Sequence, residues 1–360
     1  MNSRERFKNV INHKEPDRVP VDYWATSEIN NKILEHFNFS SLEEILEKFH
    51  VDFRYINGPE YIGPEQKVRE DGSAEDIWGV PRVQVDLDSG GGYKEVINFP
   101  LQNAKTIEEI KDYDKWPDPD WFDYSCVRRQ IAEVKSKDKI AVFMGDRMNR
   151  VSQLKPAMYL RGIEQILLDL ALNPEIAEFL FTRIAEFYRE YAKRTFEAAG
   201  SELDIFMTGD DFGTQNGPFM SQEMFKTFLL PGFKSFTQLG KKHGYYVAHH
   251  SCGSIKPLIP DLIESGLDIL NPVQPDVYDM DRKDLKERFG KDLVFHGSIS
   301  IQKTLPMGTP EDIQNEVKER FETLGPDGGF IFCTAHNIQF DTPVENILAL
   351  FEAYEEFGRY

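Results

Sequence analysis

The stretch Gly244-Tyr-Tyr-Val-Ala-His249 contains a short apolar run, and it is one of the runs that decide the fold. Similar runs recur from residue 140 onward and predict strands. They are Ile140–Met144, Asp204–Met207, Tyr245–His249, Leu267–Leu270, Leu293–Phe295 and Gly329–Phe332. Because they return repeatedly without a linker between them, we treat them as strands of one sheet.

Helical stretches separate these runs. They are Gly162–Leu170, Pro174–Ala199, Ser221–His243, Ile255–Ser265 and Pro310–Leu324. Strands that alternate with helices indicate a parallel sheet. We therefore expect an α/β protein in which residues 1–360 form a single (β/α)8 barrel rather than two domains.

The N-terminal part of the chain departs from this repeat. Arg4–His13 has the pattern of an amphipathic helix, Arg18–Trp24 that of a first strand, and Ser27–Phe37 and Ser41–Phe49 those of two more helices. Residues 52–100 are rich in Gly, Asp and β-formers, which favours a hairpin excursion. The barrel should thus carry an N-terminal extension and an early hairpin insertion.

Composition narrows the class of protein. A formal charge of −19 over 360 residues argues against binding to nucleic acid or to anionic membrane surfaces. Three cysteines do not make a disulfide framework, and Cys126 is expected to be an ordinary structural thiol. With no apolar leader and no run long enough to span a membrane, we expect a cytoplasmic protein.

Polar side chains follow most of the expected strands, at the end where barrel enzymes carry their active sites. They are Asp146, Asp210-Asp211, His249-His250, Asn271 with Gln274, His296, and Cys333 with His336. Asp at such positions also caps helices, so part of this pattern has a structural explanation. Ionisable or metal-capable groups at so many strand ends nevertheless favour a functional site.

A metal site is the most specific of these expectations. His250 and Cys252 are two residues apart on an extended chain, so their side chains point to the same face. Cys333 closes another short apolar run. One imidazole and two thiolates with a fourth position free are the ligands expected of catalytic zinc. The alternative is a buried histidine with thiols that only fill space.

Other residues near the strand ends are candidates for substrate binding and catalysis. Asp211 and His336 are the candidate catalytic residues, and Trp24 and Tyr23 could form an aromatic wall. The candidate substrate contacts are Tyr23, Trp24, Asp146, Gln215, Asn216, Gln274 and His296. For His296 a structural role is an equal alternative.

Several segments together resemble the uroporphyrinogen decarboxylase superfamily. They are Arg4-Glu-Arg-Phe7, Pro16-Asp-Arg-Val-Pro20, Thr208-Gly-Asp-Asp-Phe-Gly-Thr-Gln215, His250-Ser-Cys-Gly253, Asp268-Ile-Leu-Asn-Pro-Val-Gln274 and His336-Asn-Ile-Gln-Phe-Asp-Thr-Pro-Val-Glu-Asn346. The resemblance spans nearly the whole chain, and it implies a (β/α)8 barrel.

The resemblance implies one of two chemistries. True uroporphyrinogen decarboxylases hold their polyanionic substrate with an arginine-rich loop, but the matching stretch Asp22–Glu28 contains no arginine. The other branch, the cobalamin-dependent methyltransferases, carries a His-x-Cys pair and binds zinc. In its thiol-methylating members the last ligand is a Cys, and that position falls on His336 here, with Cys333 three residues earlier. Both remain open as the third ligand.

We therefore expect a zinc-dependent methyltransferase that moves a methyl group between a small substrate and a separate corrinoid protein. The His at position 336 favours O-demethylation of a methoxylated compound, with Asp211 or His336 protonating the leaving oxygen. The chain has no cobalamin-binding Asp-x-His-x-x-Gly signature, so the cobalamin should arrive on the partner. A homodimer is common in this superfamily, but the sequence identifies no interface.

Two alternatives remain. One is a metal-free decarboxylase, in which Arg147, Arg150 and Arg161 would replace the missing arginines. The other is a non-catalytic paralogue, which would tolerate the loss of His250 and Cys252.

Overall fold

The computed structural model describes residues 1–66, 68–86, 91–145 and 150–360. The predicted site residue Asp146, and Arg147 beside it, lie outside the described residues.

A parallel sheet forms the centre of the protein, with strand order β1-β7-β8-β9-β10-β11-β12. Its strands are β1 (Phe53–Ile56), β7 (Ile140–Phe143), β8 (Ile205–Gly209), β9 (Tyr246–His250), β10 (Ile269–Asn271), β11 (Val294–His296) and β12 (Phe330–Ile331). All neighbouring pairs are parallel, and β8 pairs with β9 from Ile205↔Tyr246 to Gly209↔His250. The six strands predicted from residue 140 onward are confirmed.

The segment around Val21 closes this sheet. Val21 forms a parallel bridge to Phe332, and the N–H of Asp22 donates to the carbonyl of Phe332 at 2.8 Å. On its other side the N–H of Asp52, which directly precedes β1, donates to the carbonyl of Val21 at 2.9 Å. The predicted first strand, Arg18–Trp24, therefore occupies the eighth position, and the α/β fold is a (β/α)8 barrel.

The prediction for residues 52–100 was partly wrong. The hairpin insertion exists, as the antiparallel strands β3 (Ala74–Glu75), β4 (Pro81–Asp86) and β5 (Gly92–Val96). Phe53–Ile56, however, is the second strand of the barrel. This strand was not predicted because it contains a charged residue. Arg54 points away from the barrel interior and binds Glu43 at 2.7 Å, so the run is not uniformly apolar.

Helices surround the barrel. They are α1 (Ser3–Ile11), α2 (Ser27–Phe37), α3 (Leu42–Lys48), α4 (Ile107–Lys111), α5 (Val127–Lys135), α6 (Leu154–Arg161), α7 (Ile163–Leu172), α8 (Pro174–Ala199), α9 (Gln222–Met224), α10 (Leu230–Lys242), α11 (Ile259–Glu264), α12 (Arg282–Phe289), α13 (Thr304–Met307), α14 (Pro310–Leu324) and α15 (Val344–Phe357). A π-helical turn (Phe225–Leu229) joins α9 to α10, 3-10 turns occupy Pro119–Trp121 and Lys256–Leu258, and β2 (Glu60–Tyr61) pairs with β6 (Phe122–Asp123).

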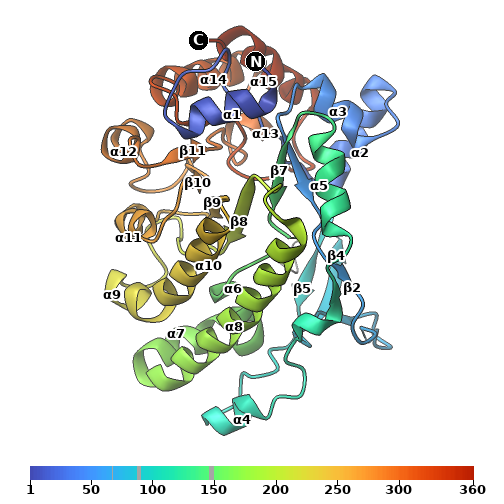
Figure 1. Cartoon of the computed structure of the whole chain (residues 1–360), viewed down its shortest axis with the longest axis vertical. Coiled ribbons are helices and arrows are strands. Elements are labelled where there is room, and N and C mark those ends of the chain that lie inside the picture. Colours follow the sequence, from blue (N-terminus) through green and yellow to red (C-terminus); the bar gives the residue numbers. More distant parts are fainter. Residues whose placement is uncertain (67, 87–90, 146–149) are drawn as a thin grey trace.

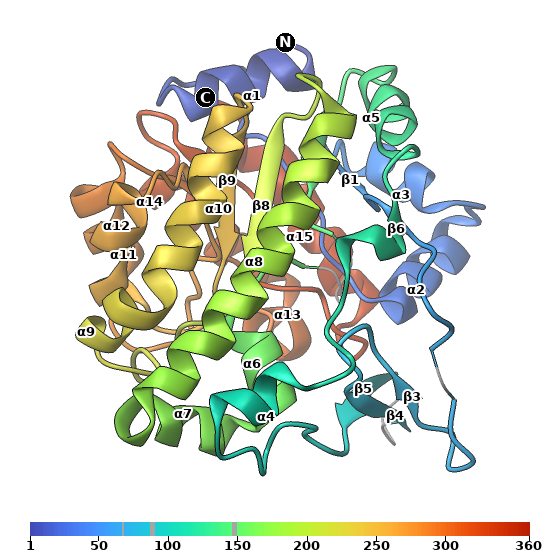
Figure 2. The ribbon, with the colours of Figure 1, turned by 60° about the horizontal axis from the view of Figure 1, so that its bottom comes forward.

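The barrel has two distinct ends. Figures 1 and 2 show both chain termini beside α1 at one end, and β3, β4, β5 and α7 at the other. Helix α1 covers the N-terminal ends of the strands, where Phe7 packs edge-on against Phe53 and Tyr246 at ring distances of 5.9 and 5.5 Å. The open mouth therefore lies at the opposite end, where the strands finish.

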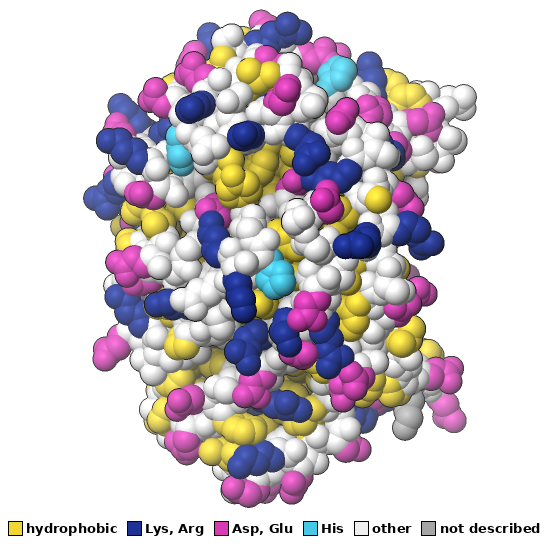
Figure 3. All heavy atoms as spheres, in the orientation of Figure 1, with side chains coloured by type: hydrophobic (Ala, Val, Ile, Leu, Met, Phe, Trp, Pro, Cys, Tyr) yellow, Lys and Arg dark blue, Asp and Glu magenta, His cyan; other side chains and the backbone are white. Residues whose placement is uncertain are grey.

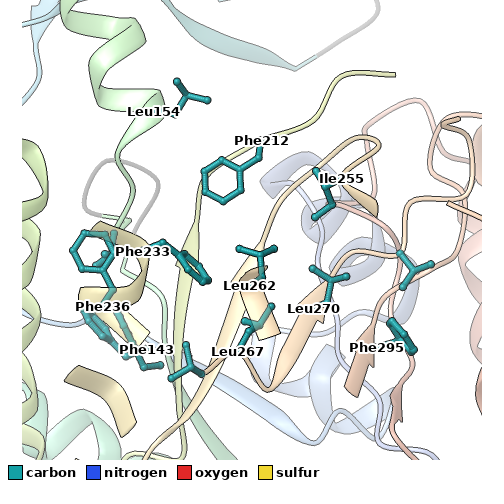
Figure 4. Close-up of a cluster of buried hydrophobic side chains, with 14 of the residues drawn as sticks. Phe143, Leu154, Phe212, Phe233, Phe236, Ile255, Leu262, Leu267, Leu270 and Phe295 are labelled. Atoms are coloured by element: carbon teal, nitrogen blue, oxygen red, sulfur yellow. The ribbon is translucent and has the colours of Figure 1, made fainter. Parts of the chain in front are cut away.

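Two apolar layers result from the period-two alternation of the strands. The inner layer fills the barrel with side chains such as Val142, Met207 and Ala248. The outer layer packs strands against helices, and Figure 4 shows part of it: Phe143, Leu270 and Phe295 from strands, Phe233 and Phe236 from α10, and Leu262 from α11.

The surface carries charges of both signs, and Figure 3 shows them interspersed on one face. No helix within the described part of the chain has both the length and the apolar character that crossing a membrane requires.

Asp52 ties the first strand to the barrel at its closed end. Its carboxylate is fully buried and lies 2.8 Å from the guanidinium groups of both Arg6 and Arg18. It also accepts from the hydroxyl of Ser3 at 2.7 Å and from the N–H of Val21 at 2.9 Å. One side chain thus connects α1, the first strand and the start of β1.

We predict that Asp52→Ala lowers the free energy of unfolding by about 3–5 kcal/mol, because it leaves two guanidinium groups without their buried carboxylate. Asp17→Ala is a matched control, since Asp17 binds the same Arg6 at 2.8 Å but is exposed. It should cost only about 0–1 kcal/mol. Urea unfolding measures both, and equal losses would contradict the role given to Asp52.

Candidate active site at the barrel mouth

The site is the uppermost inward-facing layer of the barrel. The residues two positions below it are apolar and fill the barrel, as Ala248, Val294 and Ile331 do. One step nearer the mouth, the same faces carry polar groups: Asp22, Tyr55, His250, Asn271, His296 and Cys333. The period-two alternation of the strands therefore brings polar side chains from distant parts of the sequence together at the mouth of the barrel.

His250 is held in one orientation and one tautomer. Its Nδ1 lies 2.6 Å from Oδ1 of Asn271, and Nδ2 of Asn271 donates to the carbonyl of His296 at 3.1 Å. The amide is thereby oriented, so Nδ1 of His250 carries the hydrogen and Nε2 keeps its lone pair. Burial holds the pKa of His250 well below its usual value, with a smaller opposing effect from Asp211, so the ring is neutral at pH 7.

Cys252 faces that lone pair. Its Sγ lies 3.4 Å from Nε2 of His250, so the expected pairing of these two side chains is present. Burial, with the charge of Asp211, raises the pKa of the thiol to about 12. The next residue, Gly253, has φ +87°, and a Cβ there would lie 2.4 Å from Gly213, which explains why the run ends in glycine.

His336 is the third member of this cluster. One ligand atom each from His250, Cys252 and His336 lie within 4.8 Å of one another. Nδ1 of His336 accepts from the N–H of Asn337 at 2.8 Å, which leaves the hydrogen of a neutral ring on Nε2. In this tautomer the ring can donate a proton, and Nε2 can bind a metal only after that hydrogen moves.

Cys333 lies in a different cluster. Its sulfur groups with Asp22 and His296, again within 4.8 Å, and these three side chains are buried. Among the described residues, the expected set of His250, Cys252 and Cys333 is not one of the groups that could share a metal. The difference arises because Cys333 continues the inward face of β12, whereas His336 lies beyond it in the following loop.

Asp211 and Lys155 form an ion pair beside the first cluster. Oδ1 of Asp211 accepts from the N–H of Cys252 at 2.9 Å and lies 3.7 Å from Nε2 of His250, while Oδ2 lies 2.7 Å from Nζ of Lys155. Burial alone would raise the pKa of Asp211, but the nearby ring of His250, the positive charge of Lys155 and the N–H of Cys252 together outweigh it, so the pKa is lowered. The carboxylate is ionised at pH 7.

Asp210, next along the chain, has a structural role. Its buried carboxylate accepts from the N–H groups of Gln153, Leu154 and Lys155 at 2.6–2.9 Å. These are N–H groups at the start of α6, so Asp210 holds the helix that carries Lys155.

A cavity of about 810 Å³ opens above these groups. Of the cluster of His250, Cys252 and His336, only His336 is among its lining residues, which also include Lys155, Asp22 and Trp24. Its wall is rich in aromatic side chains: Trp24, Tyr55, Trp78, Tyr93, Tyr159, Tyr188 and Phe340.

The predicted substrate contacts are scattered. Trp24 packs on His250, His296 and His336 at ring distances of 5.4, 5.9 and 6.3 Å. Tyr23 touches the cavity, but its ring packs against outer-layer aromatics and its hydroxyl donates to Asn30.

The remaining expected contacts lie away from the cavity. Gln215 and Asn216 are exposed in a turn after β8, and Gln274 accepts from the N–H of Gly253 at 2.8 Å. Arg161, an expected substitute for the missing arginines, is buried against Asp169 at 2.6 Å, whereas Arg150 lines the cavity.

Lys155 and Tyr55 were not predicted from the sequence. Lys155 lies in a helix, and no motif marks it. Tyr55 was missed together with β1, although its two-residue spacing from the apolar Phe53 is a signal that could have been used.

Comparison with known proteins agrees with this architecture. The chain is 26% identical over 201 residues to a methylated-thiol–coenzyme M methyltransferase of Methanosarcina mazei. The aligned part covers 56% of this chain and 50% of that protein. It is 22% identical over 197 residues to a uroporphyrinogen decarboxylase of Magnetococcus marinus, covering 51% and 49%. The alignments thus span about half the length of these curated relatives.

The solved structure of a methyltransferase from Methanosarcina mazei superposes with a TM-score of 0.67 at 17% identity, covering 99% of both chains, which supports the fold. The sequence model of the uroporphyrinogen decarboxylase (URO-D) family matches residues 83–357. This match covers most of the chain, and the protein belongs to the uroporphyrinogen decarboxylase family.

Proposed function

We propose that this protein is a zinc-dependent methyltransferase that moves a methyl group between a small methoxylated compound and a separate corrinoid protein. The observation that carries the proposal is the cluster of His250, Cys252 and His336 at the mouth of the barrel. The similarity to a methyltransferase of the same family supports it.

The donor set fits zinc. Nε2 of His250 and Sγ of Cys252 face each other at 3.4 Å, and Asn271 already keeps the hydrogen of His250 on the other nitrogen. Asn271 is thus the outer-shell partner that a zinc-bound histidine usually has. His336 would supply a third ligand, and because this residue lines the cavity, a fourth position on the metal would be open to substrate.

Zinc bound here would polarise the ether oxygen of the substrate as a Lewis acid. A neutral histidine at position 336 suits this chemistry, because a second thiolate would lower the positive charge of the metal. Asp211 is held ionised, so it orients the site and balances charge rather than donating a proton. Lys155, 2.7 Å from Asp211 and facing the cavity, can donate a proton from Nζ to the leaving oxygen.

The aromatic walls of the cavity support a flat, methoxylated aromatic compound as substrate. The corrinoid protein would dock at the mouth, because that is where the cavity opens. Transfer should therefore require both partners.

Our first functional prediction concerns Cys252→Ala. The purified wild-type protein should contain zinc at the mouth site, and the variant should lose the zinc of that site and lose methyl transfer by roughly 100-fold or more, while remaining folded. Elemental analysis measures the metal, and formation of methylcobalamin on an added corrinoid protein, from a methoxybenzoate, measures transfer. Cys126→Ala is the matched control and should change neither.

Two results would overturn the proposal. One is wild-type protein without bound zinc. The other is release of carbon dioxide from uroporphyrinogen, which would assign decarboxylation instead. Transfer that proceeds without any corrinoid would contradict the expected partner.

The role of His336 can be separated from that of Asn271. Loss of an outer-shell partner costs about 10–100-fold in metal affinity, so Asn271→Ala should weaken zinc binding by this amount. His336→Gln removes a ligand and should weaken binding more. If His336→Gln keeps normal zinc affinity but loses methyl transfer, His336 is a proton donor and not a ligand.

Zinc affinity should depend on pH in a defined way. With its pKa at about 12, the thiol of Cys252 is protonated throughout the neutral range, whereas His250 is already neutral. Binding therefore releases the Cys252 proton, and the dissociation constant should fall about tenfold for each unit of pH rise between about 6.5 and 8.5. Competition with a chelator of known affinity gives the slope. A flat profile would show that no thiol is deprotonated.

A further inference from the structure

We propose that Asp22, His296 and Cys333 form a second, buried metal site, which takes a divalent cation with affinity for sulfur, such as Zn²⁺. The three ligand atoms lie within 4.8 Å of one another. The three residues are 2%, 4% and 2% exposed, so the site is buried. It shares no residue with the cluster of His250, Cys252 and His336.

The position of this site in the fold suggests its role. Asp22 lies on the first strand, His296 ends β11, and Cys333 follows β12. These are three neighbouring strands, and the boundary between β12 and the first strand is where the barrel closes. A metal there would link the two ends of the sheet, so we assign it a structural role.

His296 provides independent evidence for a ligand. Its Nε2 is buried and has no hydrogen-bond partner among the described residues, although it lies only 3.1 Å from Oδ2 of Asp22. A buried polar atom without a hydrogen-bond partner destabilises the fold, and a bound cation would remove this cost. The separation of 3.1 Å is close to that between two ligands of a tetrahedral metal with bonds of about 2.0–2.1 Å.

The surroundings are suited to a cation. The carboxylate of Asp22 is oriented by the indole N–H of Trp24 at 3.0 Å and by the hydroxyl of Tyr55 at 2.6 Å, as outer-shell partners orient ligands. The Cys333 thiol lies 3.9 Å from the hydroxyl of Thr334. A divalent cation with one carboxylate and one thiolate is neutral overall, which makes burial acceptable.

Trp24 lies between the two proposed metal sites. Asp22 connects the site of Asp22, His296 and Cys333 to the mouth cavity. The ring of Trp24 packs on His250 at 5.4 Å and on His296 at 5.9 Å, so it lies between the clusters. Asp22 lines the mouth cavity. A cation could therefore enter from the cavity past the Asp22 carboxylate.

Titration with Co²⁺ tests the proposal in the full-length protein after removal of metal by a chelator. The intensity of the thiolate-to-cobalt charge-transfer absorption band measures how many equivalents of Co²⁺ bind at sites with a cysteine ligand. Wild type should bind two equivalents, and Cys333→Ala should bind one. Cys252→Ala should also bind one, whereas the double variant should bind none. Cys126→Ala, which changes the third thiol, should keep two.

Thermal unfolding separates the roles of the two metals. Loading wild type with Zn²⁺ should raise the unfolding midpoint by several degrees more than it does in Cys333→Ala, since only the deeper metal links the barrel ends. If Cys333→Ala does not fold, His296→Gln serves in its place and should also bind one equivalent.

Three outcomes would overturn the proposal. The first is a single equivalent in wild type that Cys333→Ala leaves intact, which would leave only the mouth site. The second is two equivalents in both wild type and Cys333→Ala. The third is loss of the same single equivalent in Cys333→Ala and in Cys252→Ala, which would place Cys333 in the mouth site.

Discussion

The hydrogen bonds that join the first strand to β12 and to β1 are the constraint on which the site depends. The N–H of Asp22 and the carbonyl of Pro20 both bond to the backbone of Phe332 at 2.8 Å, and this fixes the register of the first strand. A shift by one residue would turn Asp22 and Trp24 out of the barrel and Tyr23 into it. Asp52 reinforces this register from the closed end.

That register determines which groups meet at the mouth. Because every strand alternates inward and outward, the inward-facing side chains at the ends of different strands meet inside the barrel. The lower layers are apolar, and α1 covers their end, so polar groups gather only near the mouth. Trp24 separates this layer into two clusters: His250, Cys252 and His336 on one side, and Asp22, His296 and Cys333 on the other.

The sequence predicts which side chains lie close together within one strand better than it predicts which side chains of different strands come into contact. The two-residue spacing of His250 and Cys252 was sufficient to bring their side chains together, since it depends only on an extended chain. The neighbours of Cys333 depend on barrel register and on the path of the loop to His336, which no local pattern contains. Strand β1 was missed for a related reason: Arg54 faces outward and pairs with Glu43, so the run looked too polar for a barrel strand.

A histidine rather than a cysteine at position 336 has an electrostatic consequence for the proposed chemistry. A divalent metal with one thiolate and two neutral imidazoles carries a net charge of about +1, whereas two thiolates would make it neutral. The ionised Asp211 accepts a hydrogen bond from the N–H of Cys252 and would partly offset the positive charge of the metal without being one of its ligands. Lys155 forms an ion pair with Asp211 and partly offsets the negative charge of that carboxylate. A zinc ion bound there would thus stay electrophilic towards an oxygen of the proposed substrate. His336→Cys should therefore still bind zinc but be a weaker Lewis acid, and it should transfer methyl groups from ethers more slowly than wild type in the same methylcobalamin assay.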